Sequence, residues 1–224
     1  MDRITLLASL AKDANSLVDV GCDHGYVAIK AIKDFNVKNA CLIDINQAPL
    51  DNAKKNVVDN KLDDKTCFIL SDGLKDYTGE CDTLVIAGMG GILISNILKD
   101  SIVKAKSFKR VILGANSEVD KLRSFLISNR FVFDNEEIIK DGKKIYEIIV
   151  CHFDDSIRGM YSLLDMKFGP ILRKKNSALF QEVVNKKEAL LNECLSKATD
   201  SDGKSKLKVE LAFISLLRGN KNGK

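Results

Sequence analysis

Residues 17–26 read LVDVGCDHGY, an apolar run that ends in a loop with two glycines. The run Leu17–Gly21 predicts a buried parallel strand, because a continuous apolar stretch bounded by turn residues is typical of a strand covered on both faces. Gly21 and Gly25 allow the backbone to turn tightly and to approach a ligand closely. A helix that follows such a loop presents its N-terminal amides to a carboxylate or a phosphate. The stretch therefore indicates a nucleotide-type binding loop at the start of an α/β fold.

Similar apolar runs recur through the first two thirds of the chain and alternate with helical patterns. The further predicted strands are Ala40–Ile45, Cys67–Leu70, Thr83–Ala87 and Arg110–Gly114. The clearest helical patterns are Gln47–Asn60, with Leu50, Ala53, Val57 and Val58 on one face, and Val119–Arg130, with Leu122, Phe125 and Leu126. This alternation predicts βαβ crossovers and a doubly wound parallel sheet with helices on both faces.

Two β-rich runs then break the alternation. Phe131–Lys140 and Lys143–Phe153 flank the dipeptide Asp141-Gly142, which tolerates the positive φ angles of a tight turn and predicts an antiparallel hairpin. A seven-stranded sheet that is parallel except for its last hairpin is the layout of a Rossmann-like class I methyltransferase. A dehydrogenase sheet of the two-half type is parallel throughout. The predicted fold class is therefore α/β, with a doubly wound sheet of the methyltransferase type.

After Ser156 the strand signals stop and three helical spacings follow. They lie in Met160–Lys174, Asn176–Ala198 and Ser205–Arg218. We expect Pro170 to kink or cap the first helix, and the polar loop Thr199–Lys204 to reverse the last two into a helical hairpin or a short coiled coil. The sequence thus predicts two domains, an α/β domain in residues 1–155 and a helical domain in residues 156–224.

Charge is divided unevenly between these two parts. Residues 156–224 contain 14 lysines and arginines against 7 aspartates and glutamates, whereas the rest of the chain contains 21 and 24. A basic segment beside an acidic domain suggests that a polyanion such as nucleic acid docks there, although a solvated helical surface explains the charge equally well. The candidates for phosphate contacts are Arg173, Lys174, Lys175, Lys186 and Lys187.

The six cysteines form no CxxC pair and no cluster with histidine, so no metal site is expected. Four of them fall in runs predicted to be buried strands, where we expect small reduced core residues in a cytoplasmic protein. The N-terminal stretch lacks the charged region and the cleavage site of a signal peptide. The sequence also lacks the uninterrupted apolar run of about 18 residues that a membrane span requires. Neither export nor a membrane span is expected.

Asp23 argues against a dinucleotide in the first loop. It occupies the central glycine position of the GxGxxG fingerprint, and no third glycine stands at the right offset. A carboxylate here repels a pyrophosphate but pairs with the ammonium of a methionine moiety. Asp44, 23 residues beyond Gly21, ends the second predicted strand and either accepts hydrogen bonds from both hydroxyls of a ribose or caps the next helix. Asp23 therefore favours S-adenosylmethionine, whereas the ribose role of Asp44 suits NAD and S-adenosylmethionine alike.

The loops after the later strands extend the predicted crevice, because ligands of open α/β sheets bind at the carboxyl ends of the strands. Asp72 follows the third strand, where it accepts a hydrogen bond from the amine of the cofactor adenine or forms an ordinary turn. The fourth strand runs into AGMGG at residues 87–91, whose three glycines leave room for a flat base or pack a helix closely on a strand. Asn116, after the fifth strand, is positioned to reach the same crevice.

Four motifs together carry a resemblance to a known family. DVGCDHGY at 19–26, LIDIN at 42–46, SDGL at 71–74 and IAGMGG at 86–91, followed by a basic helical C-terminus, resemble the bacterial tRNA (adenine-22-N1)-methyltransferase family, TrmK. The resemblance covers residues 1 to 155 closely and the helical tail more loosely. Where the family usually has QPN after the fifth strand, this chain has Gly114-Ala115-Asn116, so only the asparagine corresponds.

The resemblance implies transfer of a methyl group from S-adenosylmethionine to N1 of an adenine, position 22 in the D-arm of tRNA. Adenine N1 carries a lone pair and loses no proton before attack, so the site has to align the base rather than supply a strong general base. Because N1 lies on the pairing edge, the base must be unpaired or flipped out.

Two sets of residues follow from this interpretation. Those expected to line the reaction site are Asp23, His24, Met89 and Asn116. Those expected to bind the cofactor are Asp19, Gly21, Cys22, Asp23, Gly25, Asp44, Ile45, Asp72, Gly73, Ala87, Gly88 and Met89. His24 either contacts cofactor or base, or only donates to a loop carbonyl. His152 is expected to be structural.

Other classes of protein remain open. A nicotinamide-dependent oxidoreductase would use Asp44 on its ribose equally well, but the missing third glycine and the terminal hairpin argue against it. A non-catalytic tRNA-binding protein on a methyltransferase scaffold and a small-molecule methyltransferase are the further alternatives. Apart from tRNA, no obligate partner, metal or membrane is evident from the sequence.

Overall fold

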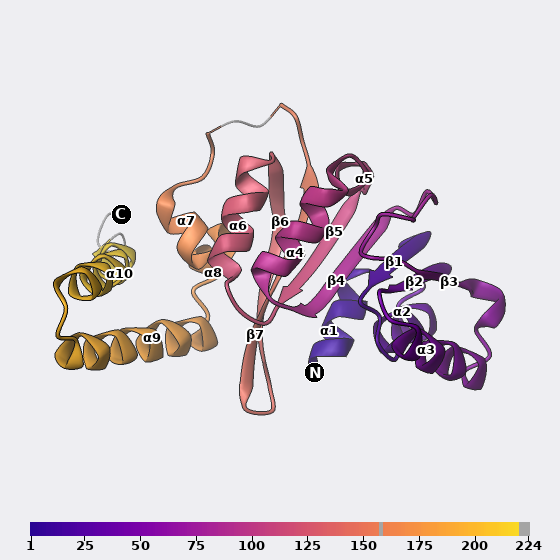
Figure 1. Cartoon of the computed structure of the whole chain (residues 1–224), viewed down its shortest axis with the longest axis horizontal. Helices are drawn as coiled ribbons and strands as arrows, with labels where there is room; N and C mark the ends of the chain where they lie inside the picture. Colours follow the sequence, from indigo (N-terminus) through magenta and orange to yellow (C-terminus); the bar gives the residue numbers. More distant parts are fainter. Residues whose placement is uncertain (157–158, 220–224) are drawn as a thin grey trace. The chain divides into compact units, whose positions relative to one another are not determined.

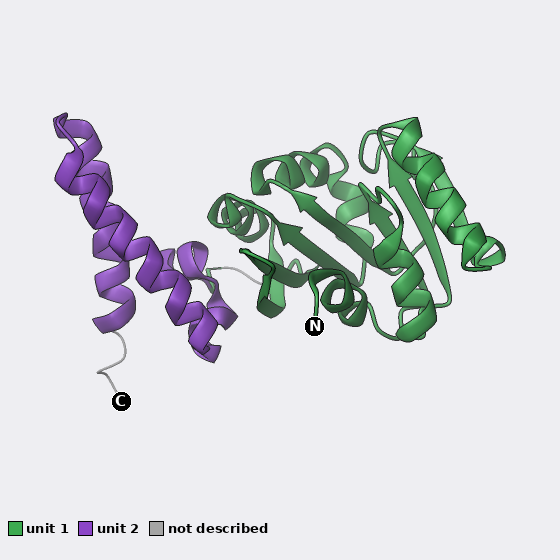
Figure 2. Cartoon of the chain, turned by 90° about the horizontal axis from the view of Figure 1, so that it is seen from below, with its two compact units in different colours: residues 1–160 green, residues 161–224 purple. Residues whose placement is uncertain are grey.

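The computed structural model describes residues 1–156 and 159–219. The chain divides into two compact units, residues 1–160 and 161–224, so the boundary lies five residues beyond the one expected from the sequence (Figure 2). The first unit is an α/β sandwich and the second consists of helices. Each unit has its own buried residues.

A seven-stranded sheet with the order β3-β2-β1-β4-β5-β7-β6 forms the centre of the first unit (Figure 1). The strands are β1 Ser16–Val20, β2 Asn39–Asp44, β3 Thr66–Leu70, β4 Thr83–Met89, β5 Arg110–Ala115, β6 Phe131–Asp141 and β7 Lys144–Phe153. Strands β1 to β5 pair in parallel, whereas β7 is antiparallel to both β5 and β6. The predicted sheet with its antiparallel last hairpin is confirmed. The strand order reverses between β1 and β4, and such a switch point opens a crevice at the carboxyl ends.

The turn of the last hairpin lies one residue later than predicted. Asp141 still pairs with Lys144, so the two turn residues are Gly142 and Lys143. Gly142 has φ +60°, as expected for the first central residue of a tight hairpin turn. The glycine therefore keeps the role expected of it, and Asp141 belongs to β6.

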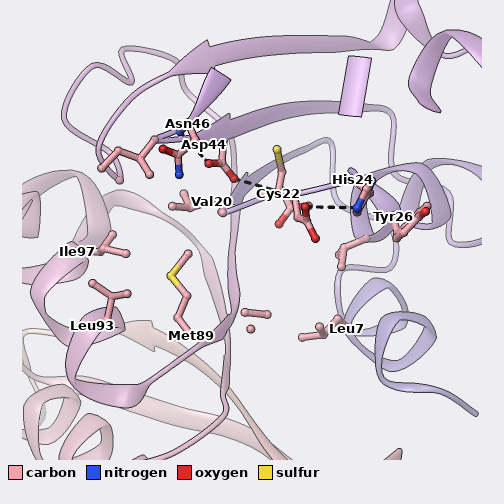
Figure 3. A pocket seen from close by; sticks show the side chains of 18 of the residues that line it. Leu7, Val20, Cys22, His24, Tyr26, Asp44, Asn46, Met89, Leu93 and Ile97 are labelled. Carbon is pink, nitrogen blue, oxygen red and sulfur yellow. Dashed lines mark hydrogen bonds and ion pairs between the residues drawn. The ribbon is translucent and has the colours of Figure 1, made fainter. Parts of the chain in front are cut away.

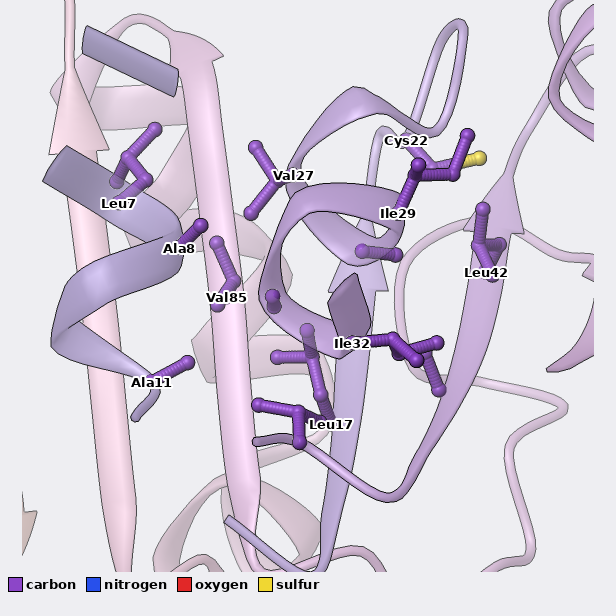
Figure 4. Close-up of a cluster of buried hydrophobic side chains, with 14 of the residues drawn as sticks. Leu7, Ala8, Ala11, Leu17, Cys22, Val27, Ile29, Ile32, Leu42 and Val85 are labelled. Atoms are coloured by element: carbon purple, nitrogen blue, oxygen red, sulfur yellow. The ribbon is translucent and has the colours of Figure 1, made fainter. Parts of the chain in front are cut away.

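Six α-helices and a short 3₁₀ turn surround the sheet in the described part of the first unit. Their bounds are α1 Arg3–Leu10, α2 Tyr26–Asp34, α3 Gln47–Asp59, η1 Asp63–Lys65, α4 Gly91–Asp100, α5 Ile102–Ser107 and α6 Val119–Ser128. Leu7 of α1 and Ala28 of α2 pack with Val85 of β4 in one core cluster (Figure 4). Leu84 and Ile86, the neighbours of Val85, are equally buried on the other face. The sheet is thus covered on both sides, as a doubly wound fold requires.

Two details of the predicted core are wrong. Val58 is 59% exposed, whereas Val57 is buried. Consecutive side chains of a helix point in different directions, so when Val57 faces the core Val58 points away from it. Cys67 is exposed although it lies in a strand predicted to be buried. The reason is its place on β3, the edge strand, which β2 alone pairs with. Helix α1 was not predicted as an element.

The second unit contains α7 Leu163–Phe168, α8 Pro170–Lys175, α9 Ala178–Lys197 and α10 Ser201–Gly219. Pro170 is the first residue of α8, and Gly169 before it has φ +81°, so the predicted helix 160–174 is split in two. The predicted loop between the last two helices is present but shorter than 199–204. Only residues 198–200 lie between α9 and α10, because the carboxylate of Asp200 accepts from the backbone N of Gly203 and α10 begins at Ser201.

Helices α9 and α10 form a hairpin in which Phe180, Val184, Ile214 and Leu217 are buried. Leu190 of α9, by contrast, is 59% exposed. No helix in the described part of the chain combines the length and apolar character that a membrane crossing requires.

Candidate functional site

A cavity of about 470 Å³ lies at the carboxyl ends of β1, β2, β3 and β4, at the switch point of the sheet (Figure 3). This volume is within the usual range of small-molecule sites. The predicted residues that line it are Asp19, Gly21, Cys22, Asp23, His24, Asp44, Ile45, Asp72, Gly73, Ala87, Gly88 and Met89. Loops that are far apart in the sequence therefore meet around one cavity.

Gly25, predicted to touch the cofactor, lies outside the lining and packs two helices together. Its φ is +71°, and an added Cβ would lie 2.8 Å from Cδ2 of Leu42 and 3.3 Å from Cβ of Ala53. Its backbone N donates to the carbonyl of Cys22 at 2.7 Å. The glycine is therefore required by the close approach of the loop to β2 and α3, and it shapes the binding loop from behind.

Asp19 is a buried carboxyl with one unsatisfied oxygen. One oxygen accepts from the backbone N–H of Ala28 in the first turn of α2, and Oδ2 has no partner within the described protein. Burial raises the pKa of Asp19 to about 7, against an ordinary value near 3.8. A positively charged group in the cavity would complete the coordination of Oδ2 and favour the ionised form.

Asp44 connects two of the loops. Its Oδ1 accepts from the backbone N of Asn46 at 3.0 Å, and its Oδ2 accepts from the backbone N of Asp23 at 3.4 Å. The side chain of Asn46, which is the N-cap of α3, makes no capping hydrogen bond. Asp44 therefore braces the turn after β2 and at the same time presents its carboxylate to the cavity.

Asp72 lines the cavity from the loop after β3. Its Oδ2 contacts Nζ of Lys75 at 2.5 Å, and the same Nζ lies 3.8 Å from Asp100. The side chain of Asp72 is 54% exposed. A ligand amine that binds Asp72 therefore shares the carboxylate with Lys75.

His24 stands at the mouth of the cavity beside another aromatic ring. Its Nε2 lies 3.6 Å from Oδ1 of Asp23, and its ring stacks on Tyr26 with centroids 5.3 Å apart. The carbonyl of His24 accepts from Nδ2 of Asn56. Tyr26 is 53% exposed and was missed from the sequence, although an aromatic residue directly after the CDHG loop was the signal for it.

Asn116 was expected to line the reaction site, but it supports the lining from outside. Its Nδ2 donates to the carbonyl of Gly88 at 2.6 Å, and its backbone N donates to the carbonyl of Met89 at 2.8 Å. Its Oδ1 accepts from Nη1 of Arg3 at 3.2 Å. Arg3 lines the cavity and places its guanidinium 4.5 Å from the centre of the Tyr146 ring. Asn116 thus fixes the loop after β4 from the outer side.

Two helices contribute walls that sequence reasoning missed. Arg3, Ile4 and Leu7 of α1 line one side, and Leu93 and Ile97 of α4 line another (Figure 3). The signal for α1 was the pattern Asp2-x-x-Thr5, since Asp2 accepts from the backbone N of Thr5 at 2.8 Å and caps the helix. The signal for α4 was the four-residue spacing of its two apolar residues, which places them on one face.

The basic residues proposed for RNA contacts differ in their surroundings within the second unit. Arg173 forms an ion pair with Asp165, and its side chain is only 18% exposed, so it holds α8 to α7. Lys187 lies 3.1 Å from Glu210 and 5.7 Å from the ring centre of Phe168. Lys174, Lys175 and Lys186 are exposed.

His152 pairs with Asp134 across the last hairpin, at 2.8 Å from Nδ1 to Oδ2. This contact agrees with the structural role expected of it. Within the described residues, no group of three or more histidine, cysteine or acidic side chains has an arrangement that could hold a metal ion.

The sequence and the fold match known proteins over nearly the whole chain. The family model of TrmK, tRNA (adenine(22)-N(1))-methyltransferase, matches residues 17–217. The tRNA (adenine(22)-N(1))-methyltransferase of Bacillus subtilis is 30% identical over 226 residues, which cover 96% of this chain and 94% of that protein.

Solved structures agree with the sequence matches. A Streptococcus pneumoniae protein in complex with S-adenosyl-L-methionine superposes with a TM-score of 0.86 at 31% identity, covering 97% of this chain and 99% of that one. The B. subtilis m1A22 tRNA methyltransferase TrmK superposes with a TM-score of 0.82 at 26% identity, covering 96% and 97%. Similarity at this level extends through both units of the chain.

Proposed function

Because the chain belongs to the TrmK family of tRNA (adenine(22)-N(1))-methyltransferases, we propose that it methylates N1 of adenine 22 in tRNA with S-adenosylmethionine as donor. The observation that carries the proposal is the cavity at the switch point, with the buried and unpartnered Oδ2 of Asp19 at its wall. A ligand that donates a hydrogen bond would satisfy that oxygen, and a cationic donor such as an ammonium would also stabilise its negative charge.

The chemistry of the cavity fits S-adenosylmethionine. Its amino acid moiety carries an ammonium, which Asp19 and Asp23 would bind beside the N-terminal amides of α2. Its ribose hydroxyls would donate to Asp44, and its adenine would pack against Leu93 and Ile97, with the amine donating to Asp72. The cofactor supplies an electrophilic methyl group on a sulfonium.

The protein's own residues act mainly by positioning. Adenine N1 attacks with a lone pair and needs no proton removed, so the rate depends on holding N1 in line with the methyl group. The loop at residues 88–91 has no bulky side chain except Met89, which leaves space for a flat base. The product carries a positive charge on the adenine, and the carboxylate of Asp23 at the cavity mouth stabilises it.

An exposed aromatic pair at the mouth suits a base that has left its helix. N1 lies on the pairing edge of adenine, so it is reached only when the base is unpaired or extruded. The ring of Tyr26, already stacked on His24, offers an apolar surface to such a base, and stacking on aromatic side chains is the usual way to hold it.

We assign the cofactor to the first unit and tRNA docking to the second. Phosphate contacts are assigned to Lys174, Lys175 and Lys186, because all three are exposed. Lys186 forms its ion pair with Glu182 on the surface of its own helix, whereas Arg173 and Lys187 pair with carboxylates of other helices, Asp165 and Glu210. This proposed substrate places the protein in the cytoplasm.

The proposal is tested by incubating the protein with S-adenosylmethionine and tRNA transcribed without modifications, followed by mass spectrometry of the nucleosides and of nuclease fragments. The expected product is 1-methyladenosine at position 22. A matched tRNA with guanosine at position 22 should remain unmethylated. Methylation elsewhere in both RNAs, or none with the native one, would contradict the proposal.

A further inference from the structure

Cys41 of β2 and Cys67 of β3 lie directly opposite each other in the parallel pairing of the two strands. Side chains of paired residues in a sheet point to the same face, and neighbouring strands are about 4.8 Å apart. The S–H of Cys41 donates a hydrogen bond to the sulfur of Cys67. The two thiols are therefore in contact without any change of the backbone.

The two members of this pair differ in access to solvent. Cys41 is 3% exposed, whereas Cys67 is exposed on the edge strand of the sheet. A small oxidant thus reaches Cys67 first, and Cys41 is sheltered behind it. This is the arrangement of an attacking thiol with a neighbouring resolving thiol.

The hydrogen bond also separates the acidities of the two thiols. It stabilises the thiolate of Cys67 and lowers its pKa to about 7, while it favours the protonated form of Cys41, whose pKa is raised by the same contact and by burial. The thiolate is the nucleophilic form of cysteine, so a substantial part of Cys67 is reactive at neutral pH.

The other four cysteines lack this combination, and Cys81, which is half-buried, precedes β4 and has no cysteine opposite it in the sheet. Burial raises the pKa of Cys22 and of Cys151, which makes both thiols inert. Cys194 is exposed on α9 of the second unit. It provides a comparison for a thiol that has solvent access but no cysteine opposite it in a sheet.

We propose that Cys41 and Cys67 form a dithiol site that reacts with hydroperoxides and closes to a disulfide between β2 and β3. The thiolate of Cys67 attacks one peroxide oxygen and becomes a sulfenic acid, and the other oxygen leaves as hydroxide. The thiol of Cys41 then attacks the sulfenic sulfur, its proton passes to the departing oxygen as the S–O bond breaks, and that oxygen leaves as water. Two thiols lose two electrons and one hydrogen peroxide is reduced to two waters.

The backbone tolerates this closure with a small movement. A disulfide needs Cα atoms 4.4–6.8 Å apart, which includes the spacing of neighbouring strands, and Cβ atoms about 3.8 Å apart, which draws the two strands slightly together. An edge strand yields to such a movement more easily than a central one, because a single neighbour constrains it. The resulting bond is accessible to thiol reductants, so the reaction is reversible.

The test uses the full chain, reduced and freed of reductant, then treated with hydrogen peroxide, blocked with N-ethylmaleimide and digested without reduction. Mass spectrometry should find the peptides of Cys41 and Cys67 joined, the intact protein 2 Da lighter, and both changes reversed by dithiothreitol. In Cys41→Ser, Cys67 should stop at a sulfenic acid that dimedone traps. The matched control Cys194→Ser should form the crosslink as the unaltered protein does.

A second measurement tests the contact without oxidation. At pH 7, iodoacetamide should alkylate Cys67 at least roughly 3-fold faster than Cys194, and Cys41→Ala should remove this advantage because alanine has no side-chain donor for the Cys67 sulfur. Oxidation of Cys67 without any link to Cys41 would overturn the proposal. Equal alkylation rates of Cys67 and Cys194 would also overturn it.

Discussion

The side chain of Met89 closes over Gly21, so that a Cβ added to Gly21 would lie 2.1 Å from Cε of Met89. Gly21 also has φ +73°, a conformation that side chains rarely adopt. The first binding loop and the loop after β4 therefore meet at a point where one of them has no side chain. This contact sets the width of the cavity between donor and base.

The Gly21→Ala variant should bind S-adenosylmethionine at least about 10-fold more weakly, because Met89 has to swing into the cavity and the loop is strained by about 1 kcal/mol. Isothermal titration calorimetry measures the affinity. Gly142→Ala is a matched control, since Gly142 has φ +60° with open space around its Cβ position and lies in the last hairpin. The control should lose similar stability and keep full affinity.

The Asp19→Asn variant should separate stability from binding. Burial raises the pKa of this carboxyl from 3.8 to about 7, so the stability that it contributes to the empty protein is fully present below about pH 4 and is lost as pH rises through 7. An amide does not ionise, so the variant should melt at a higher temperature than the unaltered protein at pH 8, with little difference at pH 4. Its affinity for S-adenosylmethionine should fall. A lower melting temperature at pH 8 would contradict the buried carboxyl as the cause.

The same shift predicts a proton released on binding. Near pH 7 part of Asp19 is protonated in the empty protein, and a cationic ligand at Oδ2 lowers its pKa again. The buffer takes up the released proton, so the binding enthalpy observed at pH 7 should differ between buffers. It should become more exothermic in a buffer whose protonation is more exothermic. This dependence should disappear in Asp19→Asn.

Replacing Asp44 by asparagine keeps the acceptor for the backbone N of Asn46 but removes the negative charge opposite the ribose. Affinity for S-adenosylmethionine should fall about 10-fold, the cost of a hydrogen bond to a charged group. Asp51→Asn on the exposed side of α3 removes one negative charge nearby and should leave affinity unchanged. Calorimetry that gives equal affinities for both variants would exclude the ribose contact.

Tyr26 is expected to act on the base rather than on the donor. In Tyr26→Leu the stacking surface beside His24 is lost, so the methylation rate at saturating donor should fall, by about 10-fold for one lost stacked base. Affinity for S-adenosylmethionine should stay within about 2-fold. A variant with normal turnover of tRNA would remove Tyr26 from the reaction site.

For tRNA docking, the double variant Lys174→Ala/Lys186→Ala should weaken tRNA binding. The slope of log affinity against log salt concentration should also become shallower, by the amount that up to two phosphate contacts contribute. The single variant Lys55→Ala on the exposed face of α3 is the control and should change neither. Arg173→Ala should instead lower the melting temperature of the protein, because it leaves Asp165 without its ion pair. Filter binding at several salt concentrations and thermal melting measure the two effects.

The sequence predicted the central strands well because each is buried on both faces and reads as an unbroken apolar run. It failed at Cys67, because strand order decides which run becomes an edge and the sequence pattern alone does not record strand order. It also made the loop before the last helix too long, because the polar residues 201–204 form the first turn of α10, which the carboxylate of Asp200 caps. Local capping outweighed composition there.

In the candidate site, the sequence located the residues at the strand ends, since parallel strands bring their carboxyl ends together. It missed Arg3 and Leu93, which reach the cavity from helices whose packing angles are set by the whole core. It also placed Asn116 in the lining and Arg173 on the surface. In both cases an interaction partner that the local sequence does not reveal holds the side chain in another direction. The carbonyl of Gly88 holds Asn116, and the carboxylate of Asp165 on the neighbouring helix holds Arg173.

Every residue that lines the cavity lies between Arg3 and Ile97. A ribosome has therefore made the complete donor pocket before it reaches β5, the antiparallel hairpin and all four helices of the second unit. The later part of the gene can diverge in what it recognises while the earlier part stays fitted to one methyl donor. Changes in the helices proposed to dock tRNA and changes in the donor pocket thus arise in separate stretches of the same message.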